Sequence, residues 1–301
     1  MGLSDFKAAG CNLCGSDRSK VLFRSGSYPK VGNGDVVRCR QCGLIYRYSP
    51  TAYSKRDPES GHKPDYPDPC TTGRMRMFDH YVQLISPLRK YNRILDVGAG
   101  RGSFLHLCSQ HGWNVWGVEA DKESADFVLK EYGLQVFHGS LEEARYPDNF
   151  FDVVTLWNVL EHILDPGTTL KEVNRVLRPG GAMFVRFPNA AFHVTCRRLF
   201  AKAHRLWEFV GQFDHCVIHL YAFSRATILR YLWKNDFAHP EVQNAWSTLA
   251  LYDFRESGMR KVMGIVTRAW AELVNLASRG HWLIAPSLLA KGIKPSRLYS
   301  A

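Results

Sequence analysis

A glycine-rich turn placed directly after a short apolar segment restricts this sequence more than any other feature. Residues 93–97 (Arg-Ile-Leu-Asp-Val) are followed by Gly98, Gly100 and Gly102, and a helical pattern begins near Gly102. Glycine tolerates the backbone angles of a tight turn, and its missing side chain lets backbone N–H groups approach a ligand closely. The segment therefore predicts a strand, a turn and a helix, with a small-molecule site at the turn. A single GxG pattern is also compatible with a turn needed only for packing, so the surrounding sequence has to decide.

The sequence after the turn alternates between buried strands and helices. Strands are predicted at residues 93–97, 115–118, 135–137, 151–156 and 182–187, with helices beginning near residues 102, 121 and 168. This alternation is typical of a parallel sheet with helices on both faces, which is a Rossmann-like α/β fold. A helix over 74–90 precedes the first strand, and a helix at 224–234 with strands at 241–244 and 283–290 is expected to complete the sheet.

Two acidic residues near the turn distinguish between classes of ligand. Glu119 ends the next predicted strand, 21 positions after Gly98, where an acid can hold the hydroxyls of a ribose in this architecture. Asp96 lies just before the glycines, and its charge disfavours a diphosphate at the turn. A cationic amino acid or a sulfonium suits this position better than a nicotinamide dinucleotide.

Four segments stand in the order shown by class I S-adenosylmethionine-dependent methyltransferases. They are 95–102 (LDVGAGRG), 118–119 (VE), 151–162 (FDVVTLWNVLEH) and 177–181 (LRPGG). The chain resembles this family strongly over about residues 74–190, and the resemblance implies S-adenosylmethionine (SAM) as the cofactor. The expected fold is then a Rossmann-like methyltransferase sheet within a domain that spans residues 74–301.

The resemblance also implies roles for individual residues. The methionine part of SAM would be held by Asp96, Gly98, Ala99 and Gly100. Glu119, with Ala120 beside it, would bind the ribose, Ser140 and Leu141 the adenine edge, and Trp157 with Asn158 would form the rim of the pocket. Residues 139–142 (Gly-Ser-Leu-Glu) depart from the commoner family pattern of a glycine followed by an acid, so the adenine contact is open among Ser140, Leu141 and Glu142.

Two CxxCG motifs near the N-terminus predict a metal site. Cys11 and Cys14 form the first pair and Cys39 and Cys42 the second, with 24 residues between the pairs. This spacing lets four thiolates converge on a tetrahedral zinc ion, which would be structural because no coordination position is left for water. Residues 1–48 are therefore expected to form a small zinc-ribbon module, and the Pro- and Ser-rich residues 49–73 a linker. A rubredoxin-like iron site is the alternative.

Methyl transfer from a sulfonium is an in-line displacement, so a general base is needed only if the acceptor has to lose a proton. The main candidate is His219, because residues 219–224 (HLYAFS) resemble a histidine-bearing segment on the substrate side of the family's fold. This segment falls within residues 190–235, which are expected to form a substrate-side insertion. His162 and Tyr221 are further candidates, although a histidine in a folded protein can also be a hydrogen-bonded structural residue.

Charge and hydropathy bear on partners and localisation. The net charge of +11 is carried by the flanks, because residues 71–190 hold 13 basic and 14 acidic side chains. No nucleic-acid-binding motif accompanies this surplus, which argues against a nucleic-acid partner. No membrane-spanning run or signal-peptide core is visible, so a cytoplasmic protein is expected. Residues 255–280 predict an amphipathic helix that either covers the sheet or, through its basic flank, associates with a membrane surface or a lipid-linked acceptor.

The resulting hypothesis is methyl transfer from SAM to a small-molecule acceptor or to a glycan or nucleotide-sugar acceptor. A glycan is included because the chain also resembles a bacterial methyltransferase group in which a zinc ribbon precedes the catalytic domain and some members act on sugars. The alternatives are an RNA or protein methyltransferase, and an inactive zinc-ribbon interaction protein on a methyltransferase fold. The sequence carries no feature that sets the oligomeric state.

Overall fold

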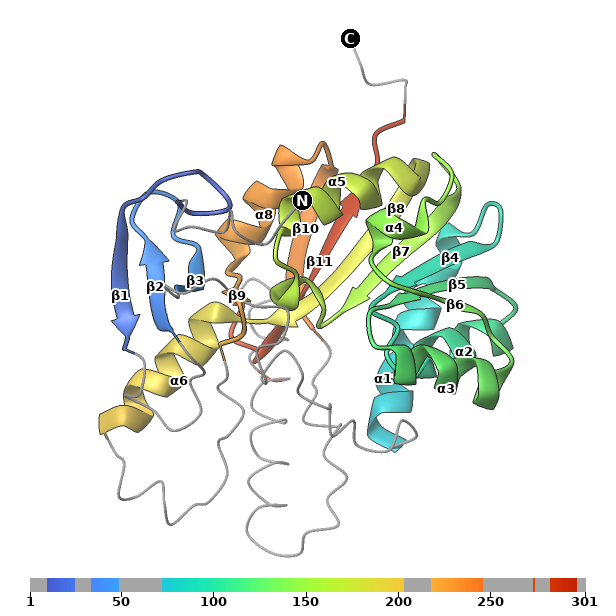
Figure 1. The fold of residues 1–301 in the computed structure, drawn as a ribbon, viewed down its shortest axis with the longest axis horizontal. Helices are drawn as coiled ribbons and strands as arrows, with labels where there is room; N and C mark the ends of the chain where they lie inside the picture. The colour runs from blue at the N-terminus through green and yellow to red at the C-terminus, as the bar shows by residue number, and fades with distance from the viewer. Residues whose placement is uncertain are drawn as a thin grey trace, which may run out of the picture.

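The computed structural model describes residues 10–24, 34–48, 72–202, 218–245, 273 and 282–296. These residues form two sheets, one of seven strands and one of four. The larger sheet runs through the middle of the molecule, and the smaller sheet lies at one end of it beside α6 (Ala190–Lys202) (Figure 1).

The seven-stranded sheet has the order β10-β11-β8-β7-β4-β5-β6. Its parallel part comprises β4 (Arg93–Val97), β5 (Asn114–Glu119), β6 (Val136–His138), β7 (Phe151–Trp157) and β8 (Leu177–Pro188). Next to β8, β11 (Ser287–Ile293) is antiparallel to both of its neighbours, β8 and β10 (Ala238–Asn244). The Rossmann-like α/β fold expected from the sequence is thereby confirmed.

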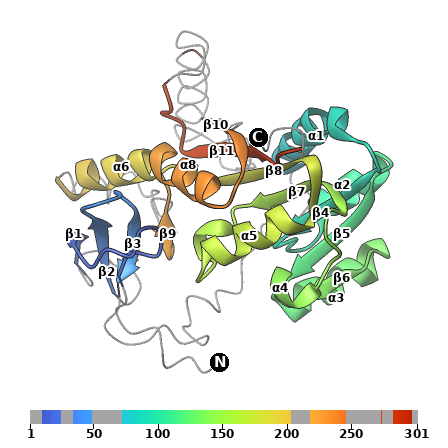
Figure 2. The ribbon, with the colours of Figure 1, turned by 90° about the horizontal axis from the view of Figure 1, so that it is seen from above.

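Helices cover both faces of this sheet. On one face, α1 (Thr72–Ile85), continued by the short 3-10 helix η2 (Ser86–Leu88), and α2 (Ser103–Gln110) pack on inward-facing residues of β4, β7 and β8. On the other face lie α5 (Pro166–Val176) and α8 (Arg225–Lys234). Figure 2 shows α5 and α8 on the opposite side of the strands from α1. Two more helices, α3 (Lys122–Tyr132) and α4 (Leu141–Ala144), accompany β5, β6 and α5.

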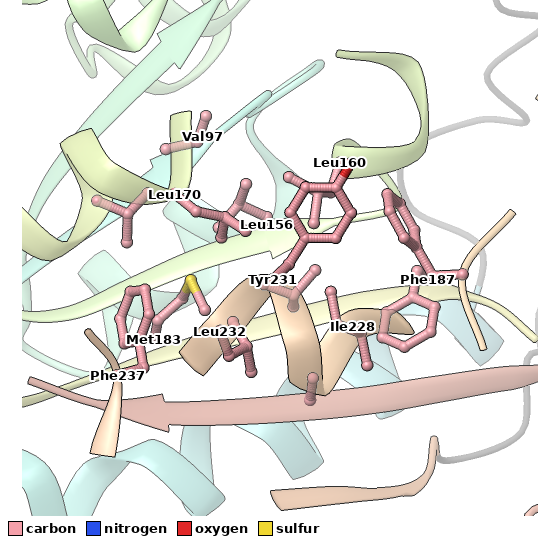
Figure 3. Packing of buried hydrophobic residues seen from close by; sticks show 14 of the residues in the cluster. Val97, Leu156, Leu160, Leu170, Met183, Phe187, Ile228, Tyr231, Leu232 and Phe237 are labelled. Carbon is pink, nitrogen blue, oxygen red and sulfur yellow. The ribbon is translucent and has the colours of Figure 1, made fainter. Parts of the chain in front are cut away.

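The core beneath α5 and α8 follows directly from the sequence pattern of the strands. β7 is buried along Phe151–Leu156, as expected for a strand of a parallel sheet that is covered on both faces. Ile228, Tyr231 and Leu232 of α8 pack over the strands, beside Leu156 and Met183 (Figure 3). Burying a side chain of this size stabilises the fold by about 1.5–3 kcal/mol, so these contacts hold α8, which the sequence predicts at 224–234, against the sheet.

Local sequence signals account for where several helices begin. The Ser224 hydroxyl caps α8 by accepting a hydrogen bond from the Thr227 N–H, and the Thr227 hydroxyl accepts one from the Ser224 N–H. Asp165 accepts from the N–H groups of Gly167 and Thr168 at the start of α5, where a proline occupies the first turn. Such caps satisfy N–H groups that have no partner within the helix.

The four-stranded sheet joins the N-terminal cysteine module to the larger domain. Its strands are β1 (Ser19–Phe23), β2 (Asp35–Cys39), β3 (Ile45–Tyr48) and β9 (Tyr221–Ala222), in that order. β3 pairs antiparallel with β9 through Ile45–Ala222 and Tyr46–Tyr221. The module is therefore continuous with a segment almost 180 residues further along the chain.

The structure also contains features that the sequence pattern does not predict. These features are strand β1, helix α6 and the pairing of β9 with β3. In addition, β11 begins at Ser287, directly after Pro286, whereas the sequence predicted that this strand begins at residue 283. Proline has no N–H to donate to a sheet, which accounts for the later start.

Some of the expected segments fall outside the described residues. These are residues 49–71 of the proposed linker and all but Leu273 of the proposed amphipathic helix, so the domain boundaries stay predictions. Within the described ranges, no helix combines the length and the apolar content of a membrane-spanning segment.

Candidate functional site

The glycine turn after β4 is built so that only a residue without a side chain fits at its first position. Gly98 has a φ of 71°, and its N–H donates to the Val118 carbonyl at 2.8 Å. A Cβ atom at this position would overlap the side chain of Val159, which follows β7. The glycine thus brings the turn against the segment after β7, at the carboxyl ends of the parallel strands where ligands bind in this architecture.

Glu119 ends β5 and points its carboxylate at the same turn. Its Oε2 accepts a hydrogen bond from the Gly100 N–H at 2.7 Å, and its Oε1 accepts one from the Asp121 N–H at 2.9 Å. The carboxylate is half-buried, so its position is fixed while part of it remains accessible. The neighbouring Ala120 is exposed. This arrangement presents a preoriented negative charge beside the glycine cradle, as the binding of two ribose hydroxyls requires.

Asp96, at the end of β4, is almost completely buried, with 2% of its surface exposed. Its Oδ1 accepts a hydrogen bond from the Thr155 hydroxyl at 2.7 Å. Burial raises the pKa of Asp96 well above its usual value, and the negative charge of Glu119 adds to this effect while the Thr155 bond opposes it. Because a nearby cation favours the ionised carboxylate, two acids beside one turn form a site suited to a positively charged ligand.

The predicted adenine contacts occupy the start of α4. The Ser140 hydroxyl accepts a hydrogen bond from the Glu143 N–H, and the Glu143 carboxylate accepts one from the Ser140 N–H, so the two residues form a capping box. Leu141 is buried in the core, whereas the Glu142 carboxylate accepts a bond from the Thr169 hydroxyl at 2.7 Å. The hydroxyl of Ser140 is thus already used by the helix, and its role toward adenine stays a prediction.

Trp157 and Asn158 stand at the end of β7, between the glycine turn and β8. The Trp157 ring stacks on Tyr81 of α1, with ring centroids 4.7 Å apart. Asn158 has a φ of 59° and links two charged residues. Its Oδ1 accepts a hydrogen bond from Arg186, and its Nδ2 donates to Glu161 Oε1 at 3.2 Å. Both residues directly precede Val159, whose side chain approaches Gly98, and their place at the rim of the pocket stays a prediction.

The three candidates for acid–base chemistry differ in their surroundings. The rings of His162 and His219 lie with centroids 4.2 Å apart, and the Glu161 carboxylate completes a group whose polar atoms all lie within 4.8 Å of one another. Tyr221 is buried and donates its hydroxyl to the Leu164 carbonyl at 2.9 Å. The tertiary structure therefore brings the two predicted histidines together, while the Tyr221 hydroxyl holds the loop before α5.

The four predicted metal ligands converge at one point of the N-terminal module. The Sγ atoms of Cys11 and Cys42 are 3.3 Å apart and those of Cys14 and Cys39 are 3.6 Å apart, and all four lie within 4.8 Å of one another. Four sulfurs bound tetrahedrally at about 2.3 Å from zinc would be about 3.8 Å apart. Gly15 and Gly43, with φ of 76° and 81°, form the tight turns that follow each pair. The donor set and its spacing therefore fit a tetrahedral metal ion.

Hydrogen bonds from α8 hold the cysteine module against the larger domain. Arg230 donates to the Cys42 carbonyl at 2.8 Å, Lys234 to the Leu13 carbonyl at 3.2 Å, and the Tyr231 hydroxyl to Asn12 Oδ1 at 2.7 Å. Arg47 of β3 donates from its backbone N–H to the Leu220 carbonyl at 2.9 Å and from its guanidinium to the Ile218 carbonyl at 2.9 Å. These bonds fix the residues on both sides of His219 to the module.

Arg186 was not among the predicted site residues. It is 3% exposed near the end of β8, the only charged residue in the segment 182–187 that was predicted as a strand, whereas Glu161, 1% exposed, follows β7 at the end of the 151–162 motif. A lone arginine in a strand predicted to be fully buried is a signal that sequence reasoning can use, because a buried charge requires a specific partner.

Comparisons with known proteins agree with this geometry. A family model described as "Methyltransferase domain" matches residues 72–241. Two curated relatives are ubiquinone biosynthesis O-methyltransferases. The one from Maricaulis maris is 34% identical over 150 residues, covering 46% of this chain and 58% of that protein. The one from Ralstonia nicotianae is 30% identical over 149 residues, covering 47% and 59%. The chain thus matches little more than half the length of these relatives.

Solved structures show the same fold at low sequence identity. Phosphoethanolamine N-methyltransferase 2 of Haemonchus contortus, in complex with S-adenosyl-L-methionine, has a TM-score of 0.50 and 15% identity, covering 89% of this chain and 70% of that chain. Geranyl diphosphate methyltransferase, in complex with GPP and sinefungin, has a TM-score of 0.50 and 16% identity, covering 73% and 79%. Together with the family match over more than half of its residues, these likenesses show that the chain belongs to the family of methyltransferase domains and has the Rossmann-like fold of SAM-dependent methyltransferases.

Proposed function

We propose that the protein transfers a methyl group from SAM to an oxygen atom of a small-molecule acceptor. The observation that carries this proposal is the Glu119 carboxylate, held at the carboxyl end of β5 by the Gly100 and Asp121 N–H groups. A fixed acid beside a glycine cradle provides the contacts that ribose hydroxyls need. The oxygen acceptor is supported by the two curated relatives, which are named O-methyltransferases.

The proposed SAM site is formed by residues at the ends of β4, β5 and β7. Asp96 and the turn 98–100 would hold the amino-acid part, Glu119 the ribose, and the start of α4 the adenine. SAM supplies a methyl group on a positively charged sulfur, and the buried Asp96 favours such a cation over a diphosphate. Val159 touches the turn from the side of β7, so Asn158 and Glu161 flank the place where the methyl group would be presented.

The proposed acceptor side contains the histidine pair. Desolvation of the imidazole and the charge of Arg47 lower the pKa of His162 to about 4, although the residue as a whole is exposed. A neutral imidazole can accept a proton, and His219 lies against it. We infer that His219 assists the loss of the acceptor proton, with His162 beside it. Tyr221 supports this arrangement through its bond to Leu164 and need not touch the acceptor.

Zinc is the metal that we propose for the four cysteines. The Sγ separations fit four-coordinate zinc, and four thiolates leave no position for water, so the metal would stabilise the module without taking part in the reaction. Its structural effect would extend to His219, because the module shares a sheet with β9 and binds the Leu220 backbone.

A glycan or nucleotide-sugar acceptor is the second candidate. It is favoured by the junction of the cysteine module with β9, which places the module next to the acceptor side, together with the resemblance to ribbon-bearing sugar methyltransferases. Contact with a membrane surface or a lipid-linked acceptor was predicted from residues 255–280, which lie outside the described residues except for Leu273.

Two measurements test the proposed function. Calorimetry should show binding of SAM and S-adenosylhomocysteine (SAH) but not of NAD, and tighter binding of NAD would refute the proposal. SAH production should then be measured with phenols, nucleotide-sugars, glycans and lipids as acceptors. His219→Ala should lower turnover with the active acceptor about 10²- to 10⁴-fold while the SAM affinity stays the same, as expected for loss of an acid–base group. Full activity of this variant would exclude the role of His219.

A further inference from the structure

Three buried polar atoms lack a hydrogen-bond partner where β7 and β8 end. They are Glu161 Oε2, Arg186 Nε and Trp157 Nε1, and within the described part of the chain none of them is paired. Trp157 and Arg186 are register neighbours on adjacent parallel strands, so their side chains leave the sheet on the same face. Only 1% of Glu161 and 3% of Arg186 is exposed. One side of the predicted pocket thus concentrates unpaired donors and an unpaired acceptor.

Such a concentration is unfavourable for folding by itself. A buried donor or acceptor without a partner costs about 1–3 kcal/mol, and more when the group is charged. Groups of this kind in a native structure therefore require an explanation, and clusters of perturbed ionisable groups are typical of functional sites. The three residues lie at or just after the carboxyl ends of β7 and β8, where ligands bind in open α/β sheets, so an acceptor-binding role is the most direct explanation.

Asn158 organises the cluster. Its Oδ1 accepts from Arg186 Nη1 and its Nδ2 donates to Glu161 Oε1, while Arg186 Nη2 donates to the Ser287 hydroxyl at 3.1 Å. One oxygen of the carboxylate and both ends of the guanidinium are therefore fixed. The Asn158 backbone N–H also donates to the Arg186 carbonyl at 2.8 Å. Glu161 Oε2 and Arg186 Nε remain unpaired, and both belong to residues that touch the same asparagine. Around this one asparagine, one acceptor and one donor are thus left without a partner among the described residues.

We propose that Glu161 and Arg186 bind the reacting hydroxyl of the acceptor, with Glu161 taking its proton and the Arg186 Nε–H holding the oxygen that becomes negative. This inference rests on the proposed function and assigns its substrate class. The O–H bond breaks and the proton passes to Glu161 Oε2. The oxygen then bonds to the methyl carbon as the carbon–sulfur bond breaks, and that electron pair stays on sulfur, which becomes a neutral thioether. His162 and His219 can then pass the proton from Glu161 toward solvent.

The chemistry of the carboxyl group restricts the acceptor. Burial raises the pKa of Glu161 to about 7, an effect that the Asn158 bond and the charge of Arg186 partly oppose. The other ionisable groups around it are His162 of the same short helix η3 (Leu160–His162) and His219 before β9, while Arg47 of β3 acts on His162. A phenol, with a pKa of about 10, is close enough in acidity to give its proton to such a group, whereas an aliphatic alcohol is a much weaker acid.

The acceptor class is therefore a small molecule with an acidic hydroxyl, a phenol or an enol. Trp157 belongs to the same cluster, and its indole N–H can donate to a second oxygen next to the reacting one. Catechol carries both oxygens and is a suitable probe. The experiment uses the intact protein saturated with SAH, so that binding and proton transfer occur without methyl transfer.

Two readouts on catechol binding at pH 8 test the assignment. A phenolate absorbs at longer wavelength than a phenol, so the difference spectrum reports ionisation, and calorimetry in buffers of different ionisation enthalpy counts the protons released. The wild type should bind catechol as a phenolate with almost no net proton release, because Glu161 is ionised at pH 8 before binding, takes up the proton, and is kept protonated by the negative charge of the phenolate beside it. Glu161→Gln should release about one proton per bound phenolate, since no carboxylate is left to accept it. Arg186→Met should weaken phenolate binding about tenfold or more.

Glu172→Gln is the matched control, because Glu172 pairs with Arg175 on α5, away from the cluster, and should behave like the wild type. Three results would each overturn the inference. These are binding of catechol only in its neutral form, no binding of catechol at millimolar concentration, and release of the same number of protons by the wild type and Glu161→Gln. If Arg186→Met fails to fold, the proton release of the nearly isosteric Glu161→Gln still tests whether Glu161 takes the proton. Failure of SAH itself to bind would refute the proposed function instead, so the two outcomes are distinguishable.

Discussion

Removing the Glu119 carboxylate is the sharpest test of the cofactor site. In the structure each carboxylate oxygen accepts one backbone N–H, from Gly100 at 2.7 Å and from Asp121 at 2.9 Å. The group is thus already oriented toward the turn before a ligand arrives, and little ordering is needed when ribose hydroxyls donate to it. A hydrogen bond to a charged group is worth about 1.5–3 kcal/mol, and part of that is offset by the water that the free carboxylate would otherwise bind.

Glu119→Ala should therefore weaken SAM and SAH binding by about 1–3 kcal/mol, or about 5- to 150-fold in the dissociation constant. Glu119→Gln keeps one oxygen acceptor but turns an N–H donor toward either Gly100 or Asp121, so its affinity should lie between those of Glu119→Ala and the wild type. Titration calorimetry on folded protein measures both constants. Glu131→Gln is the control, because Glu131 is an exposed carboxylate on α3.

Binding of SAM by Glu119→Ala within about twofold of the wild type, with unchanged thermal unfolding, would contradict a ribose contact by this carboxylate. In that case the carboxylate would serve only to hold the turn, and the ribose contact inferred from the family resemblance would be wrong. A loss of affinity in Glu131→Gln as large as in Glu119→Ala would point instead to a general effect of net charge on ligand binding.

Two further predictions concern the metal and the buried carboxyl group. Purified protein should contain one zinc per chain. Cys42→Ser should lower the zinc content and speed amide hydrogen exchange at Tyr221 and Ala222, which pair with β3, while SAM affinity stays nearly constant. Elemental analysis that finds no zinc in the wild type would contradict the assignment. Because burial raises the pKa of Glu161 from the usual value near 4.5 to about 7, the folded state holds this proton more tightly than the unfolded state. The wild type should therefore lose stability relative to Glu161→Gln as pH rises from about 4 to 7, by about 1–3 kcal/mol, with no difference near pH 4. Thermal unfolding at pH 4 and pH 8 measures this, and a more stable wild type at pH 8 would argue against a desolvated carboxylate.

The sequence by itself determined those parts of the protein that depend on local interactions. The strand, turn and helix around Gly98 follow from an apolar run and from glycines at positive φ. The strands predicted at 93–97 and 151–156 correspond to β4 and β7, because alternating buried strands and helices produce a strong periodic signal. The two CxxCG motifs likewise predicted the four cysteines that converge, since the turn after each pair is local.

Contacts between distant segments were decided only by the tertiary structure. The pairing of β3 with β9, the approach of His219 to His162, and the Arg186–Asn158–Glu161 cluster join residues from separate elements. Sequence spacing carries no information on which side chains meet across such distances, and β9 has only two residues, too few for a periodic signal. A buried arginine such as Arg186 requires a partner, and which residue becomes that partner depends on how β7 and β8 align in the sheet, because register decides which buried side chains become neighbours.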